Sequence, residues 1–262
     1  MKKVKIISLS VGLFFLSVIV CFGESLYQVG TLQALLKGLY HSTVTVKVSR
    51  QHADTGVGCG VGVGEVIALD GYYFCTDEKG YTKKLSDKDG LPFFTGAKFK
   101  PTIKYTVRDI TSIGELEKTI EQHTKSDNIF YLIRVDGFFR EVYARSEDRI
   151  KDPAKYKPLL EWMETHQNKY YFKGIKGTLV AVKSPDIIKN IGVPGYHVHF
   201  INNTRSVGGH VFDVQIENGS VEIQPLYSMN LILPRTKEFL AQNMFVNSID
   251  QAGLHKLEAI QK

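Results

Sequence analysis

Three histidines have the spacing of a metal-binding site. His197 and His199 are separated by one residue within the strand-like segment 196–201. Because successive side chains of a β-strand point to opposite faces, these two imidazoles project from the same face. His210 begins the next strand-like segment, and the turn-rich stretch 202–209 lets that segment return beside the first. The three rings can therefore converge on one point.

Three imidazoles on rigid strands are typical of a site for catalytic zinc or a related divalent ion. A site with only three protein ligands leaves positions open for substrate, which favours Lewis-acid chemistry on a carbonyl or carboxylate. The other histidines have no such spacing and are interpreted as surface or core residues: His41, His52, His123, His166 and His255.

The elements that must position these histidines are mostly strands. In the last third of the chain, strands are predicted at 178–182, 196–201, 210–216 and 221–229, with brief helices at 185–190 and near 237–241. Earlier strands are predicted at 43–49, 65–69, 72–75, 103–107, 129–135 and 138–144. The regular alternation of strands with long helices is missing, so the sequence predicts an α+β protein with mixed or antiparallel sheets.

Helices and turns are indicated by local signals in the first part of the chain. Thr31 and Ser112 are predicted N-caps of helices, and residues 153–166 have helical periodicity. Asp-Gly pairs at 70–71 and 136–137 predict tight hairpins. Strand signals dominate beyond about residue 170. We interpret this change as a boundary between an N-terminal mixed-sheet domain, 24–170, and a C-terminal metal-binding β domain, 171–262.

Glycine occupies every second position from Gly56 to Gly64. A phosphate-binding loop would need a lysine-bearing motif or a following helix, so these glycines are expected to allow close backbone approach or sharp bending. Cys59 lies within this stretch, and Cys75 follows it. An oxidising compartment would permit a bridge between them, but unpaired thiols fit the sequence equally well.

The N-terminus has the features of a secretory signal peptide. Three lysines precede an apolar run over about 6–22, and Gly23 offers a cleavage point, so segment 1–23 is expected to be removed on export to the periplasm or medium. A retained membrane anchor or a lipoprotein at Cys21 are the alternatives. Cleavage would leave 30 basic against 27 acidic residues, a balance too mild to indicate nucleic-acid binding.

Several blocks resemble a known family. Gly177-Thr178-Leu179-Val180, residues 193–201 and Gly208-Gly209-His210-Val211 resemble the C-terminal signature of alpha-acetolactate decarboxylases. Glu65 with Leu69-Asp70-Gly71, and residues 135–138 followed by Arg145-Ser146, resemble the N-terminal blocks in the same order. From pattern alone, Glu65 and Arg145 would be ordinary charges of a hairpin and a strand edge.

The resemblance implies conversion of 2-acetolactate, a small 2-hydroxy-3-keto acid, to acetoin and carbon dioxide. It implies two domains, of which the first extends its sheet in a homodimer. The metal-ligand role falls on His197, His199 and His210, with zinc the expected ion. Polar active-site roles fall on Glu65, Arg145 and, in a weakly matching tail, Glu258. The glycine-rich segment departs from the family, with Cys59 near a position that is normally threonine.

Two other functions fit three histidines on β-structure. One is a cupin-like metal-dependent isomerase or dioxygenase, which would not require Glu65 and Arg145. The other is a non-catalytic exported protein that binds a metal or ligand, which would retain metal without turnover.

Overall fold

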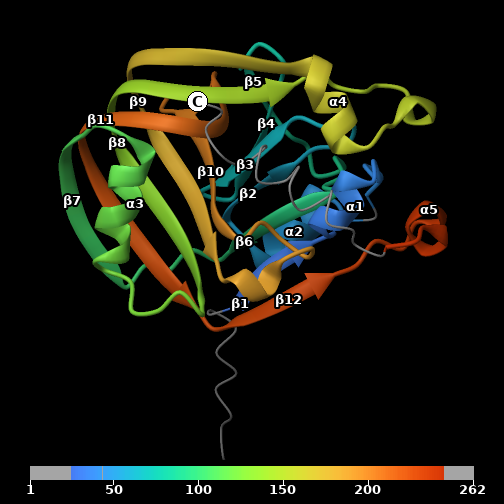
Figure 1. Cartoon of the computed structure of the whole chain (residues 1–262), viewed down its shortest axis with the longest axis horizontal. Coiled ribbons are helices and arrows are strands. Elements are labelled where there is room, and N and C mark those ends of the chain that lie inside the picture. Colours follow the sequence, from blue (N-terminus) through green and yellow to red (C-terminus); the bar gives the residue numbers. More distant parts are fainter. Residues whose placement is uncertain (1–24, 43, 245–262) are drawn as a thin grey trace, which may run out of the picture.

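The computed structural model describes residues 25–42 and 44–244, which form two β-sheets with short helices around them (Figure 1). The larger sheet has seven strands. They lie in the order β12 (Ser228–Ile232), β1 (Ser25–Val29), β6 (Phe93–Ala97), β2 (Thr55–Cys59), β3 (Glu65–Leu69), β4 (Tyr72–Thr76) and β5 (Thr82–Lys84). β1 and β12 are parallel and the other neighbours antiparallel, so the sheet is mixed, as predicted.

The second sheet contains the long strands. Its order is β10 (Gly195–Asn202), β9 (Gln167–Ser184), β8 (Phe130–Glu147), β11 (Gly208–Leu226) and β7 (Ile103–Ile110). All of these neighbours are antiparallel. An additional pairing of β10 with β11 joins β10, β9, β8 and β11 into a closed ring of strands. This pairing brings the two histidine-bearing strands side by side.

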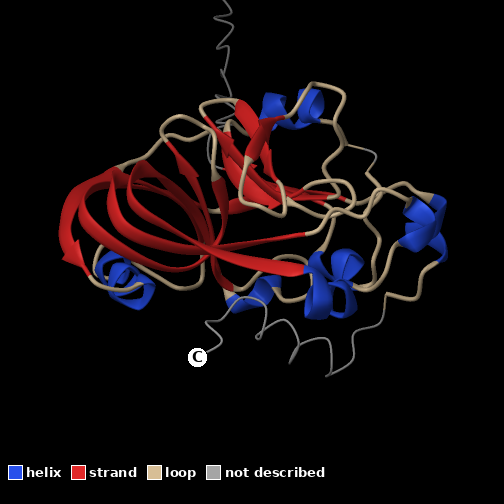
Figure 2. Cartoon of the chain, turned by 90° about the horizontal axis from the view of Figure 1, so that it is seen from above, coloured by secondary structure: helices blue, strands red, loops and turns tan. Residues whose placement is uncertain are grey.

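The helices are short and lie at the periphery of the strands (Figure 2). They are α1 (Leu32–Leu36), α2 (Val46–His52), α3 (Ile113–Glu121), α4 (Leu159–His166) and α5 (Lys237–Ala241), with 3₁₀ turns η1 (Pro153–Lys155) and η2 (Asp186–Ile188). Among the described helices, none has the length and apolar character needed to cross a bilayer. The predicted α+β class is confirmed.

Two apolar clusters hold the strands that carry the candidate site. One fills the curled second sheet, where the ring of Phe200 packs edge-on against Phe139 at a centroid distance of 5.2 Å. The other joins the two sheets, with Ile67 of β3 and Ile201 of β10 among its buried members. Close packing of this kind resists displacement, so β3 and β10 are held in a defined relation.

Several local predictions are confirmed. The Thr31 side chain accepts a hydrogen bond from the Ala34 amide, and Ser112 Oγ accepts one from the Glu115 amide, so both residues cap helices. The pair Asp70-Gly71 has positive φ values of 53° and 79°, as expected for a tight turn between β3 and β4.

The strand predicted over 43–49 is wrong, because residues 46–52 form helix α2. The alternating valines suggested a strand, but Val48 is 42% exposed. Val46, Ser49 and Ala53 are instead fully buried. Their spacing of three and four residues is that of a helix face, and this packing prevailed over the β-propensity of valine.

The hairpin predicted at Asp136-Gly137 is also wrong. β8 runs without a break from Phe130 to Glu147, since it is paired with β9 on one side and β11 on the other through this point. A Cβ at Gly137 would lie 2.4 Å from the Asn218 carbonyl oxygen. This glycine therefore permits close approach of a neighbouring strand rather than a reversal of the chain.

The strand signals from 167 onward belong to longer strands than predicted. β11 joins most of the predicted strands 210–216 and 221–229, and β9 extends the predicted strand 178–182 back to Gln167. Residues 153–166 form η1 and α4 instead of one helix. The boundary predicted near residue 170 falls inside β9, whose sheet also contains β7 and β8. The division into two domains stays a prediction.

Candidate active site

The three predicted histidines meet between β10 and β11. His199 and His210 face each other in the strand pairing, and His197 lies two residues earlier on the same face of β10. The ring centroids of His197 and His199 are 4.7 Å apart, and each lies 5.3 Å from that of His210. One nitrogen of each ring lies within 4.8 Å of the others, and all three residues are buried.

A backbone contact across the two sheets orients His199. Its Nδ1 lies 2.8 Å from the carbonyl oxygen of Val66 on β3. Because a carbonyl can only accept, Nδ1 carries the proton and Nε2 of the neutral ring carries a lone pair. This lone pair faces His197 Nε2 at 3.1 Å and Glu65 Oε2 at 3.2 Å. Such an anchored ring is the arrangement by which proteins present imidazole to a metal.

Burial keeps the three imidazoles neutral. It lowers the pKa of His197 to about 3, with a smaller contribution from the positive charge of Arg145. Burial also holds the pKa of His199 and of His210 well below the ordinary value. Neutral imidazole is the form that binds metal, so the donor set fits a divalent transition ion such as zinc.

These depressed pKa values predict acid sensitivity of the metal-free chain. Each imidazole has a lower pKa folded than unfolded, so below about pH 6.5 protons bind preferentially to the unfolded chain. The contribution of the neutral rings to the free energy of unfolding is therefore fully present above this pH and is lost as the pH decreases toward 3. For three histidines we expect a loss of about 4 kcal/mol between about pH 7.5 and pH 5.5.

Urea unfolding of the chelator-treated protein at these two pH values measures the loss. In His197→Asn the loss should be about a third smaller, because one titrating group is missing. A free energy of unfolding that does not change between the two pH values would contradict the assignment of neutral buried rings.

A buried ion-pair network adjoins the histidines. The Arg145 guanidinium donates through Nη1 to Glu65 Oε1 at 2.6 Å, and through the same nitrogen to Glu147 Oε1. The three side chains are at most 8% exposed. Glu65 begins β3, whereas Arg145 and Glu147 end β8, so the network joins the two sheets beside the histidine cluster.

The network and two of the histidines line one small cavity of about 40 Å³. Its polar side is formed by Glu65, Arg145, Glu147, His197 and His210. The rest of the lining is largely apolar and includes side chains of the helices α1 and α4, with Leu32, Leu35, Leu159, Met163 and Val193 among the lining residues. A concave site with a few convergent polar groups and an apolar wall is typical of small-molecule binding.

Glu147 is a site residue that the sequence analysis missed. The signal that could have found it is its position two residues after Arg145, because alternate residues of a strand share a face. Glu258 of the predicted set lies outside the described residues, as does the leader 1–23.

The glycine-rich segment shapes one wall of this cavity. Gly58 in β2 lies so close to the neighbouring strand that a Cβ would be 2.3 Å from the Phe93 carbonyl oxygen. The thiol of Cys59, the next residue, lines the cavity, and burial raises its pKa. Cys59 and Cys75, whose pairing was open from sequence, are both free thiols.

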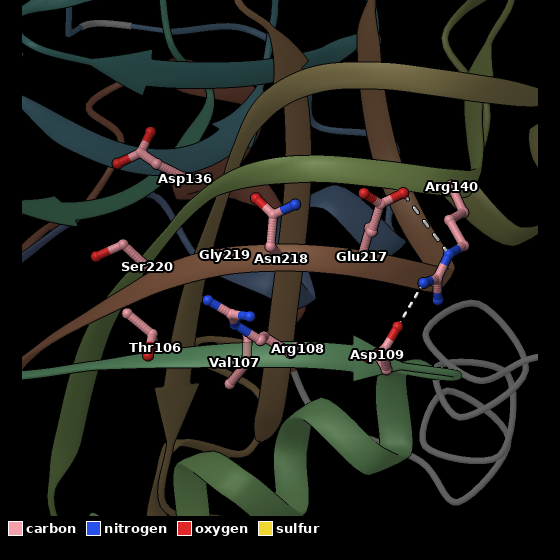
Figure 3. Close-up of a pocket in the computed structure, with 10 residues that line it drawn as sticks. All are labelled: Thr106, Val107, Arg108, Asp109, Asp136, Arg140, Glu217, Asn218, Gly219 and Ser220. Carbon is pink, nitrogen blue, oxygen red and sulfur yellow. Dashed lines mark hydrogen bonds and ion pairs between the residues drawn. The ribbon is translucent and has the colours of Figure 1, made fainter.

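A wider hollow of about 740 Å³ lies elsewhere, over the bend of β7, β8 and β11 (Figure 3). Three of its charged groups are paired with one another on the surface: Arg140 contacts Asp109 and lies 3.9 Å from Glu217. Exposed pairs of this kind contribute little energy and bring together no buried reactive group. The histidine cavity is therefore the better candidate for chemistry.

Comparisons with known proteins identify the family of this chain. A family model described as alpha-acetolactate decarboxylase matches residues 26–245. The chain belongs to the alpha-acetolactate decarboxylase family. Membership makes it a decarboxylase, that is, a carboxy-lyase.

Individual relatives match nearly the whole chain. The alpha-acetolactate decarboxylase of Methanosarcina mazei is 35% identical over 90% of this chain and 80% of its own length. That of Bacillus licheniformis is 34% identical over 82% of this chain and 85% of its own. The crystal structure of the alpha-acetolactate decarboxylase from Bacillus subtilis strain 168 has a TM-score of 0.84 and 31% identity, covering 90% of this chain and 99% of that one.

Proposed function

We propose that this chain converts 2-acetolactate to acetoin and carbon dioxide with a divalent metal, zinc or a related ion, held by His197, His199 and His210. The observation that carries the proposal is the convergence of three buried neutral imidazoles beside the Glu65–Arg145 ion pair. The choice of 2-acetolactate as the substrate rests on the relatives, which are named alpha-acetolactate decarboxylases.

The reaction needs a place for an electron pair and a source of one proton. When the bond between the carboxylate carbon and C2 of acetolactate breaks, carbon dioxide leaves and the electron pair remains on C2. This pair delocalises onto the neighbouring ketone oxygen, and a proton added at C2 completes acetoin. A divalent ion bound at the histidines would supply positive charge for the substrate oxygens on which negative charge develops.

Two side chains of the cavity have the chemistry for the other steps. Among the described residues that line the cavity, Arg145 carries the positive charge, and its guanidinium matches a carboxylate in shape and hydrogen-bond pattern. Arg145 therefore binds and orients the substrate carboxylate until it leaves. Glu65 lies between Arg145 and His199, where a carboxyl group can deliver the proton to C2.

The apolar wall suits the rest of the substrate. Acetolactate carries two methyl groups, and the leucine and methionine side chains of α1 and α4 can cover them. The cavity has room for only a few water molecules, so substrate binding must displace some of these side chains outward. Met163, which is unbranched and flexible, is suited to such movement.

The sequence adds two proposals about the setting of this enzyme. The basic and apolar start of the chain supports export with removal of 1–23, and the family resemblance supports a homodimer. N-terminal sequencing of the mature protein tests the first, and a mass of two chains by light scattering tests the second.

The test of the function is acetoin formation by the purified protein. We expect turnover of acetolactate that falls about a hundredfold or more after chelation and returns when zinc is added. Absence of acetoin from metal-loaded protein would reject the proposal. Oxygen consumption by the iron-loaded protein would favour a dioxygenase, and tight metal retention without any turnover would favour a binding protein.

A further inference from the structure

Glu147 lines the cavity and has a carboxylate oxygen without a hydrogen-bond partner among the described residues. Its side chain is 2% exposed and lines the cavity together with His197 and His210. One carboxylate oxygen, Oε1, accepts from Arg145, but Oε2 has no hydrogen-bond partner among the described residues. A buried carboxylate oxygen without a partner is costly, so its retention in a ligand cavity points to a partner supplied by the ligand.

The neighbouring carboxylate is placed differently. Glu65 has Oε1 on Arg145 and Oε2 facing His199, so both of its oxygens are directed at side chains of the site. Glu65 is assigned to the delivery of a proton, whereas Glu147 Oε2 offers an acceptor to a bound molecule. Because it is an acceptor, it would repel the carboxylate and ketone oxygens of a substrate and attract a hydrogen-bond donor.

We propose that Glu147 is a substrate-binding residue that selects 2-hydroxy acids by accepting a hydrogen bond from the substrate hydroxyl. The inference rests on the proposed function. An ionised 2-hydroxy-3-keto acid has one hydrogen-bond donor, its hydroxyl group. The carboxylate and the hydroxyl of such a molecule are both attached to C2. Arg145 can place the two near their partners at once, since the guanidinium that attracts the substrate carboxylate is the group that holds Glu147 Oε1.

The experiment compares two small acids that differ only at the hydroxyl. 2-Hydroxy-2-methylpropanoate and 2,2-dimethylpropanoate have the same carboxylate and similar volume, and neither loses carbon dioxide as a 3-keto acid does. Their dissociation constants are measured by calorimetry with the zinc-loaded full chain and with Glu147→Gln. We expect the preference of the wild type for the hydroxy acid to fall about tenfold in Glu147→Gln, because the hydroxyl loses its carboxylate acceptor.

A purely structural role of Glu147 predicts a different result. If Glu147 only positioned Arg145, both acids would bind more weakly by the same factor and their ratio would not change, and this outcome would overturn the proposal. Glu141→Gln on the same strand is the matched control, because Glu141 pairs with Lys173 on the surface and should leave both constants unchanged.

A second measurement covers the case that Glu147→Gln does not fold. In a crystal of the wild type with 2-hydroxy-2-methylpropanoate, the hydroxyl oxygen should lie within hydrogen-bond distance of Glu147 Oε2, and a longer separation would overturn the inference. Failure of the proposed function is distinguishable, since it appears as absence of acetoin formation by the wild type whatever the ratio of the two acids.

Discussion

Replacing His199 with alanine is expected to lower acetoin formation by roughly a thousandfold or more and to remove most of the bound metal. This ring contributes one of the three converging nitrogens and is anchored by Val66 on the other sheet. With two histidines left, the metal loses a ligand that the fold holds in position, and the developing charge on the substrate loses its principal stabilisation.

The measurement combines metal content with kcat on acetolactate. His199→Asn separates the metal role from the structural one. Its amide N–H can still donate a hydrogen bond to the Val66 carbonyl, but it lacks the Nε2 lone pair that would bind the metal. His123→Ala controls for loss of a histidine outside the cluster; this ring stacks on Tyr105 at the surface. Full metal content and turnover in His199→Asn would show that the cluster is not the metal site.

Changing Glu65 to glutamine is expected to reduce kcat by about a hundredfold to ten-thousandfold while the metal content stays unchanged. Glutamine keeps an oxygen that can accept from Arg145, but its amide cannot deliver the proton that C2 requires. Glu65 contacts His199 and Arg145 but is not one of the three converging histidine ligands, so the chemistry should fail without loss of the ion.

The chirality of the product gives a second measurement for Glu65→Gln. A fixed carboxyl group adds the proton to one face of C2, so the wild type should release mainly one enantiomer of acetoin. In the variant, water would supply the proton and the product should be closer to racemic. Glu222→Gln, in a surface pair with Lys104, is the control. An unchanged kcat with unchanged enantiomeric purity would exclude Glu65 as the proton donor.

Local signals in the sequence predicted the parts of this site that depend on one strand or one turn. The shared face of His197 and His199 follows from the two-residue period of a strand, and both lie on β10. The arrival of His210 beside them follows from a turn-rich loop of suitable length, and the strand pairing places it opposite His199. Asp70-Gly71 predicted its turn for a similar reason, since few residue pairs adopt two positive φ angles.

Errors arose where one pattern fits two structures. Alternating valines in the segment 43–49 fit a strand, but Val46, Ser49 and Ala53 have the spacing of a helix face. All three are fully buried, and this burial favours the helix. Asp136-Gly137 matches a hairpin turn, but strands on both sides extended β8 through it. In both cases contacts with residues distant in sequence outweighed a local preference of about 1 kcal/mol.

By itself, then, the sequence determined the three metal-binding candidates, the family and the α+β class, because strand periodicity, turn chemistry and ordered motifs are local properties of the chain. Only the tertiary structure decided how Glu65 meets Arg145, 80 positions later, and brought Glu147 into the same cavity. The physical reason is that packing of the two sheets brings these charges together, and that their attraction becomes strong only in the low-dielectric interior which this packing creates. Neither effect exists until distant strands are in contact.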